Sequence, residues 1–284
     1  MQRGTPPSYW VHDLDPFLVQ FGEGFGIRYY GLAYLLGFAA AALLLRAYAK
    51  AGRSQLSFAA SIDLVFALVI GVIIGGRLGF FLLYQPQTLL RDPLALVRLW
   101  EGGMASHGGF IGVTIALWWF ARSRKVSMLH LGDLIATTAP AGLFFGRVAN
   151  FINGELWGRI TDVPWAVIFP QSMPGEPPIL IPPRHPSQLY EAGLEGLLLL
   201  AVFQWRFWKT DIARRAPGQI AGEFLLAYAI VRMLGERFRE ADPHVPEIMG
   251  LNAGAFYSIF LIVAGIAVIL WARRTAPANA RAKK

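Results

Sequence analysis

Two arginines stand in stretches that are otherwise apolar, and their spacing could direct both toward one anion. Arg147 and Asn150 lie at i and i+3 on one face of a predicted helix, and Arg232 and Glu236 lie at i and i+4 on another. An ionisable side chain inside a membrane span costs at least ~2.5 kcal/mol, so either a function or a paired structural contact must account for it. Arginine forms bidentate hydrogen bonds to phosphate, which is therefore the anion that this pair fits. The alternative is ion pairing between helices, with carboxylates from Glu155, Glu223 or Glu236.

One histidine is framed by glycines. His107 stands in Gly102-Gly-Met-Ala-Ser-His-Gly-Gly109 at the start of an apolar run. Because histidine titrates near neutral pH, it can take or give a proton, and the glycines would let a substrate or another backbone approach closely. The alternative is a histidine at a helix start, beside glycines that serve helix packing.

Three further residues accompany these candidates. Tyr30 opens the first apolar run, where it could face a polar interior or belong to the aromatic belt of a membrane interface. Arg77 lies in another apolar run, and Arg239 follows Glu236 by less than one turn. The sequence leaves open whether these two arginines contact a substrate or form structural ion pairs.

Several kinds of chemistry are excluded by residue type. The chain has no cysteine, which rules out disulfides, a thiol nucleophile of its own and thiolate-bound zinc or iron–sulfur clusters. Its five histidines are scattered without metal-ligand spacing, and there is no nucleophile elbow, phosphate loop or dinucleotide fingerprint. We therefore expect no metal and no cofactor.

The elements that position these residues are predicted membrane helices. Of the 284 residues, 55% are apolar and 15% charged, and the mean hydropathy is +0.45, too apolar for a soluble surface. Uncharged runs long enough to cross a bilayer predict an all-α integral membrane protein with seven transmembrane helices. The predicted spans are residues 29–45, 64–84, 107–121, 134–151, 189–205, 220–238 and 248–272.

The connections between these spans predict the orientation. The larger share of the 26 lysines and arginines falls in one set of connections and in the C-terminal tail. By the positive-inside rule that side is cytoplasmic, so we expect the N-terminus outside and the C-terminus inside. Residues 1–284 then form one membrane domain, with an external N-terminal arm over 1–28 and an external proline-rich loop over 153–187. A short strand is expected within residues 165–169.

Four sequence blocks resemble a known family. They are Tyr30–Gly37, Gly102–Gly109, Gly146–Gly158 (GRVANFINGELWG) and Arg184–Glu191. Together and in this order they resemble the prolipoprotein diacylglyceryl transferases of bacterial inner membranes, over nearly the whole chain. Two positions depart from the family pattern: Glu240-Ala-Asp242 replaces a Pro-Asp pair, and Gly254-Ala255 stands where a Met-Gly-Gln is common.

The resemblance implies an activity and its substrates. The diacylglyceryl group of phosphatidylglycerol would pass to the lipobox cysteine of a prolipoprotein whose signal peptide is still attached. The products would be a thioether-linked lipid and glycerol phosphate, in the first step of bacterial lipoprotein maturation. The protein would lie in the cell inner membrane among membrane lipids, with a small external (periplasmic) head region. Because the topology rule already accounts for the basic clusters, we expect no nucleic-acid partner.

The resemblance also assigns roles to residues. Arg147 and Arg232 would hold the charge of the departing phosphate, and His107 is the candidate general base for the partner's thiol. Asn150 and Tyr30 would orient the lipid headgroup, and Glu155 and Glu236 would fix the arginines. The residues with implied substrate contact are Tyr30, Arg147, Asn150, Glu155, Gly158, Arg232, Glu236 and Arg239.

Three other functions fit parts of the pattern. A transporter or channel would also carry charges in its spans, an intramembrane hydrolase could use Ser106 with His107, and an assembly subunit could use the arginines for structure alone. The clustering of the charges toward the outer half favours the transferase over a transport path.

Overall fold

The computed structural model describes residues 9–22, 25–99, 102–241 and 250–276. The chain forms two compact units, one from residues 1–41 together with 135–284 and one from residues 42–134. Helices α1 (Tyr29–Lys50) and α5 (Met128–Ile152) each contribute residues to both units.

The unit of residues 42–134 is built on two helices packed through glycine. Helix α2 (Phe58–Tyr84) is followed by the short helices α3 (Pro86–Arg91) and η1 (Pro93–Leu96), and then by α4 (Ser106–Arg124). A Cβ added at Gly112 of α4 would collide with the main-chain oxygen of Gly71, and one at Gly108 with that of Gly75. Small residues therefore let the two backbones meet, as is typical of helix packing in membranes.

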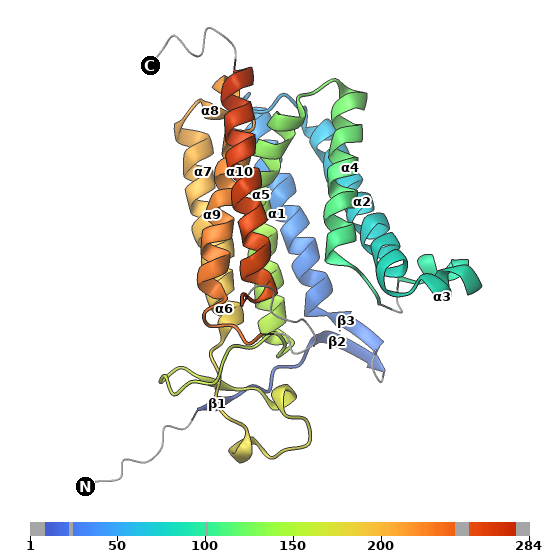
Figure 1. The fold of residues 1–284 in the computed structure, drawn as a ribbon, viewed down its shortest axis with the longest axis vertical. Coiled ribbons are helices and arrows are strands. Elements are labelled where there is room, and N and C mark those ends of the chain that lie inside the picture. Colours follow the sequence, from blue (N-terminus) through green and yellow to red (C-terminus); the bar gives the residue numbers. More distant parts are fainter. Residues whose placement is uncertain (1–8, 23–24, 100–101, 242–249, 277–284) are drawn as a thin grey trace. The chain divides into compact units, whose positions relative to one another are not determined.

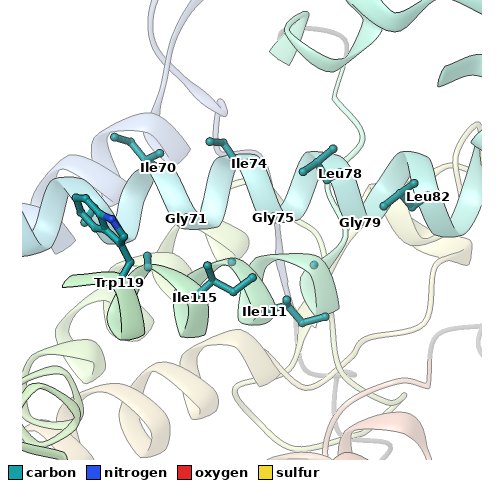
Figure 2. Close-up of a pocket in the computed structure, with 14 residues that line it drawn as sticks. Ile70, Gly71, Ile74, Gly75, Leu78, Gly79, Leu82, Ile111, Ile115 and Trp119 are labelled. Carbon is teal, nitrogen blue, oxygen red and sulfur yellow. The ribbon is translucent and has the colours of Figure 1, made fainter. Parts of the chain in front are cut away.

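The same two helices form an apolar groove of about 550 Å³. Figure 2 shows Ile70, Ile74 and Leu78 of α2 along one side, with Ile115 and Trp119 of α4 along the other. None of the residues predicted to do chemistry lines this groove. Its lining suits hydrocarbon, and the polar chemistry must be sought elsewhere.

The other unit is a group of long helices with a small irregular region at one end (Figure 1). Its helices are the first part of α1, most of α5, a continuous helix made of α6 (Ser187–Glu191), the π-helix η5 (Ala192–Leu198) and α7 (Leu199–Lys209), then α8 (Ile212–Arg215), α9 (Gln219–Gly235) and α10 (Ala253–Thr275). Helix α9 packs against α10 through another glycine contact, since a Cβ at Gly222 would lie 2.7 Å from the main-chain oxygen of Gly265.

Short strands occur in the same unit. Strand β1 (Trp10–Val11) pairs in parallel with β4 (Val167–Ile168), and β2 (Phe17–Gly22) forms an antiparallel hairpin with β3 (Phe25–Arg28). The strand expected within residues 165–169 is confirmed, although only two residues long. Two 3-10 turns, η3 (Pro170–Ser172) and η4 (Pro178–Leu180), follow β4 in the proline-rich segment. Nε2 of buried His12 donates a hydrogen bond to the main-chain oxygen of Phe151, 2.7 Å away, and ties this region to the end of α5.

Four helices among the described residues are long and apolar enough to cross a membrane: α1, α2, α5 and α10. The all-helical membrane class expected from composition is therefore confirmed. The other three predicted spans coincide with α4, the α6–η5–α7 helix and α9, and the seven-span count stays a prediction. The first helix runs on past residue 45 to Lys50, and the last begins at Ala253, whereas part of its predicted start lies in residues 242–249, outside the described chain.

Candidate active site

Three arginines and three glutamates from different helices meet in one buried ionic cluster. They are Arg147 of α5, Glu191 of α6, Glu195 of η5, Arg232 of α9, and Glu236 and Arg239 in the turn after α9. The formal charges of the six side chains cancel. Burying charge is costly unless each group is paired and hydrogen-bonded, and here the opposite charges supply the partners.

Arg147 is held by the two carboxylates of the α6–η5–α7 helix. Its Nε and Nη2 donate to Glu195 Oε2 at 3.2 and 3.0 Å. Its Nη1 lies 2.9 Å from Glu191 Oε2, but this ion pair lacks the alignment of a hydrogen bond. Glu191 Oε2 is buried without a hydrogen-bond donor among the described residues. A carboxylate oxygen is thus left able to accept one more donor.

Arg232 of α9 binds the same two carboxylates. Its Nη1 donates to Glu191 Oε1 at 3.0 Å and to Glu195 Oε1 at 3.2 Å, and its Nη2 donates to Glu236 Oε1. Arg239 adds an ion pair of 3.5 Å between its Nη1 and Glu191 Oε1. Glu191 and Glu195 therefore bridge the arginines, and their exposed fractions are 1% and 0%.

The π-helix η5 lies where these two carboxylates are. Such wide turns are rare and recur at functional sites, because they change the direction of side chains within a helix. Packing holds the segment tightly against α5, since a Cβ at Gly196 would lie 2.6 Å from the Cβ of Phe144. The α6–η5–α7 helix thus brings Glu191 and Glu195 to the arginines of α5 and α9.

A second polar group forms at the end of α5. The N–H of Gly154 donates to the carbonyl of Phe151 and that of Glu155 to the carbonyl of Asn150, a Schellman end in which Gly154 has φ +65°. This turn folds Glu155 back on the helix, where its Oε1 accepts from Asn150 Nδ2 at 2.8 Å. Asn150 Nδ2 also lies 3.4 Å from Tyr30 Oη. Three predicted site residues are therefore in contact.

Gly158 lies where three segments converge. Its N–H donates to the carbonyl of His185 at 2.9 Å, and it pairs with Arg239 in an antiparallel bridge. A Cβ here would lie 2.6 Å from the Cβ and carbonyl oxygen of His185 and from the carbonyl oxygen of Phe238. Only glycine lets the chain that follows α5 approach the segment of Arg239 this closely.

Three hydrogen-bonded side chains, those of Trp165, Tyr190 and His185, lie next to the segments that meet at Gly158. Trp165 Nε1 donates to Tyr190 Oη at 2.6 Å, and Tyr190 Oη lies 3.2 Å from His185 Nδ1. Burial lowers the pKa of His185, which favours the neutral ring as the acceptor of the tyrosine hydroxyl. Tyr190 directly precedes Glu191, so these hydrogen-bonded side chains are also next to the ionic cluster in the sequence.

The remaining predicted residues lie in the other unit. His107 is exposed in the first turn of α4. Buried Arg77 donates to the main-chain carbonyls of a turn that leads toward α4, with no carboxylate among these acceptors. They are Ala95, Leu96, Arg98, Gly102 and Gly103. These bonds support a structural role for Arg77, one of the two roles left open, with main-chain carbonyls as partners in place of a carboxylate.

The comparisons with known proteins agree with the resemblance. The family model described as prolipoprotein diacylglyceryl transferase matches residues 16–271. This chain belongs to the prolipoprotein diacylglyceryl transferase family. A phosphatidylglycerol–prolipoprotein diacylglyceryl transferase of Pseudoalteromonas atlantica is 44% identical over 273 residues, which are 94% of this chain and 92% of the relative. One of Rhodospirillum rubrum is 46% identical over 270 residues, which are 93% of this chain and 94% of the relative.

In this member of the transferase family, sequence reasoning missed the carboxylates that bind the arginines. Glu155 contacts Asn150, and Glu223 forms a separate pair with Arg206 at 2.9 Å. Of the three carboxylates considered, only Glu236 reaches a cluster arginine. The signal for the missing pair was present, because Glu191 and Glu195 are acidic residues four apart in an apolar run.

Proposed function

We propose that this protein transfers the diacylglyceryl group of phosphatidylglycerol to the lipobox cysteine of a prolipoprotein. Family membership supports the reaction. The observation that carries it in this chain is the buried cluster in which Arg147 and Arg232 are fixed by shared carboxylates. Residues so arranged can stabilise charge that develops on a phosphate, at no cost of rearrangement during the reaction.

The reaction is a displacement at carbon. The cysteine thiol loses its proton, and the thiolate sulfur attacks the carbon of the diacylglyceryl group that is bonded to a phosphate oxygen. A carbon–sulfur bond forms as the carbon–oxygen bond breaks, and the bonding electrons leave with glycerol phosphate. That product carries one more negative charge than the phosphodiester did, so the barrier falls if cations face the departing oxygen.

The arginines keep donors for this task. Of the five N–H groups of a guanidinium, Arg147 uses two in its hydrogen bonds to Glu195, and Arg232 uses three in its bonds to Glu191, Glu195 and Glu236. Glu191 Oε2 pairs with Arg147 Nη1 but accepts no hydrogen bond among the described residues, so it can accept one from a hydroxyl of the glycerol headgroup. Headgroup hydroxyls and phosphate would then bind to adjacent parts of one cluster.

Other residues complete the proposed site. Asn150, held by Glu155 and beside Tyr30, orients the headgroup, and the bridge between Gly158 and Arg239 fixes the backbone that carries the Arg239 side chain. His107 takes the thiol proton. The seven spans, the single domain with its external arm and loop, the outward N-terminus and the inner-membrane location complete this proposal.

The test is lipidation of a lipobox peptide by the purified chain, with phosphatidylglycerol in detergent and the product detected by mass. Wild type should form a thioether product, and a peptide whose cysteine is replaced by serine should not react. Arg232→Lys should lower kcat/KM at least about a hundredfold, because lysine cannot make the bidentate contacts. Arg206→Lys is the matched control, since Arg206 binds Glu223 through two N–H groups outside the cluster.

Each outcome tests a different part of the proposed function. Absence of product from folded wild type, across several phospholipids, would refute the transferase and favour transport. Full activity in Arg232→Lys would refute the phosphate role of the cluster, and full activity in His107→Ala would refute the general base. Loss of activity in Ser106→Ala would favour the hydrolase alternative.

A further inference from the structure

One side chain joins the last helix to the ionic cluster. Asn252 is the N-cap of α10, where its Oδ1 accepts from the N–H of Ala255 at 3.1 Å. Its Nδ2 donates to Glu236 Oε2 at 2.5 Å. Glu236 is itself the C-cap residue of α9. The amide therefore spans from the start of one helix to the end of its neighbour, with each of its two polar atoms in use.

A glycine makes this contact possible. Gly254 lies in the first turn of α10, and a Cβ there would come within 3.0 Å of Oε1, Cδ and Cγ of Glu236. The Glu236 side chain thus lies flat against the start of α10.

We propose that Asn252 is a positioning residue for the transfer reaction, acting on Arg232 through Glu236. The inference rests on the proposed function. The two carboxylate oxygens of Glu236 have separate partners, Arg232 on Oε1 and Asn252 on Oε2. Asn252 fixes the rotation of the carboxylate, and the carboxylate fixes the guanidinium that binds the phosphate.

The size of the effect follows from the kind of bond. Glu236 is 6% exposed, so water cannot readily replace a lost donor. A hydrogen bond to a buried charged group is among the stronger ones, and its loss lowers an equilibrium constant about ten- to a hundredfold. If the bond acts through Arg232, this loss should be seen in the kinetics of phosphatidylglycerol.

Three variants separate positioning from helix capping. Asn252→Ser keeps an N-cap oxygen but cannot hold Glu236, and we expect kcat/KM for phosphatidylglycerol to fall about tenfold or more while helix content is unchanged. Gly254→Ala displaces Glu236 with Asn252 intact and should give a similar loss. Ser57→Ala removes the N-cap bond of α2 and should change kcat/KM less than about twofold.

An exchange of groups tests the contact itself. Asn252→Asp keeps the cap but sets a carboxylate against Glu236, so activity should fall further than in Asn252→Ser. Combining it with Glu236→Gln restores one donor and one negative charge to the pair, with the new amide oxygen facing Arg232. The double variant should recover at least about tenfold over Asn252→Asp, which a purely structural cap would not produce.

The failures are distinguishable. If wild type gives no lipidated peptide, the proposed function fails first. If wild type is active and Asn252→Ser retains full kcat/KM, the positioning role is refuted and the function stands. If the Glu236→Gln exchange gives no recovery over Asn252→Asp, the two side chains do not act as a pair, and the inference is likewise overturned.

Discussion

Replacing Glu195 by glutamine tests the central claim that shared carboxylates hold the arginines of the cluster. Glu195 accepts three hydrogen bonds, two from Arg147 and one from Arg232, and its side chain is fully buried. The amide keeps the shape but turns one oxygen into a donor that faces another donor. Two arginines then share one fewer counter-charge.

The magnitude follows from burial. Removing one partner of a buried ion pair costs about 3–5 kcal/mol. The arginine side chains are only 16% and 14% exposed, so solvent screens them little. Glu191 and Glu236 remain as partners, which favours the lower figure, about 3 kcal/mol. At about 2–4 °C per kcal/mol for a chain of this size, the midpoint should fall by about 6–12 °C.

The assay is thermal unfolding of purified protein in one detergent, with lipidation kinetics on the same samples. Misplaced arginines should lower kcat/KM about a hundredfold, because small shifts of binding groups cost that much. Glu223→Gln is the matched control. This change breaks the ion pair between Glu223 and Arg206, two side chains that are each 26% exposed. It should lower the free energy of unfolding by about 1 kcal/mol or less. A Glu195→Gln protein as stable and active as wild type would refute the reasoning.

Three further predictions follow from single contacts. Gly158→Ala should lose nearly all activity with helix content intact by circular dichroism, because a Cβ collides with the main chain at His185; normal turnover would contradict this. Arg77→Lys should lower the midpoint of thermal unfolding, since three ammonium donors replace a guanidinium that contacts five carbonyls. An unchanged midpoint would show that these five contacts do not stabilise the fold. Burial lowers the pKa of His185 below its value of about 6.5 in the unfolded chain. The unfolded chain therefore binds more protons at acid pH, and the free energy of unfolding should fall as the pH drops below that value. A His185→Gln protein should show a smaller fall between pH 7 and 5, and an identical fall would exclude this group.

Much of the molecule follows from sequence by local rules. Long apolar runs can satisfy their backbone in a membrane only as helices or closed barrels, and the runs around α1, α2, α5 and α10 are indeed helical. Helical spacing places Arg147 and Asn150 on one face, and the span predicted over 134–151 ends one residue before α5 does. These features depend on residues within one or two turns of each other, so they need no knowledge of the rest of the chain.

The pairing of charges could not be read in the same way. Arg147 meets Glu195 across 48 positions and Arg232 meets Glu191 across 41, while the nearer Glu155 bonds to Asn150 instead. Which side chains meet depends on how each helix is rotated against its neighbours, and a π-helix changes that rotation along the α6–η5–α7 helix. The side-chain periodicity of one helix predicts neither its rotation against its neighbours nor the position of a π-helix.

The sequence by itself therefore determined the class of protein, the places of its helices and the family to which it belongs. Only the tertiary structure decided that Glu191 and Glu195 bridge the arginines, that Gly158 has no room for a Cβ and that Asn252 holds Glu236. The physical reason is range: hydrophobicity and helix spacing act between near neighbours along the chain, whereas a buried charge selects its partner by distance in the folded molecule.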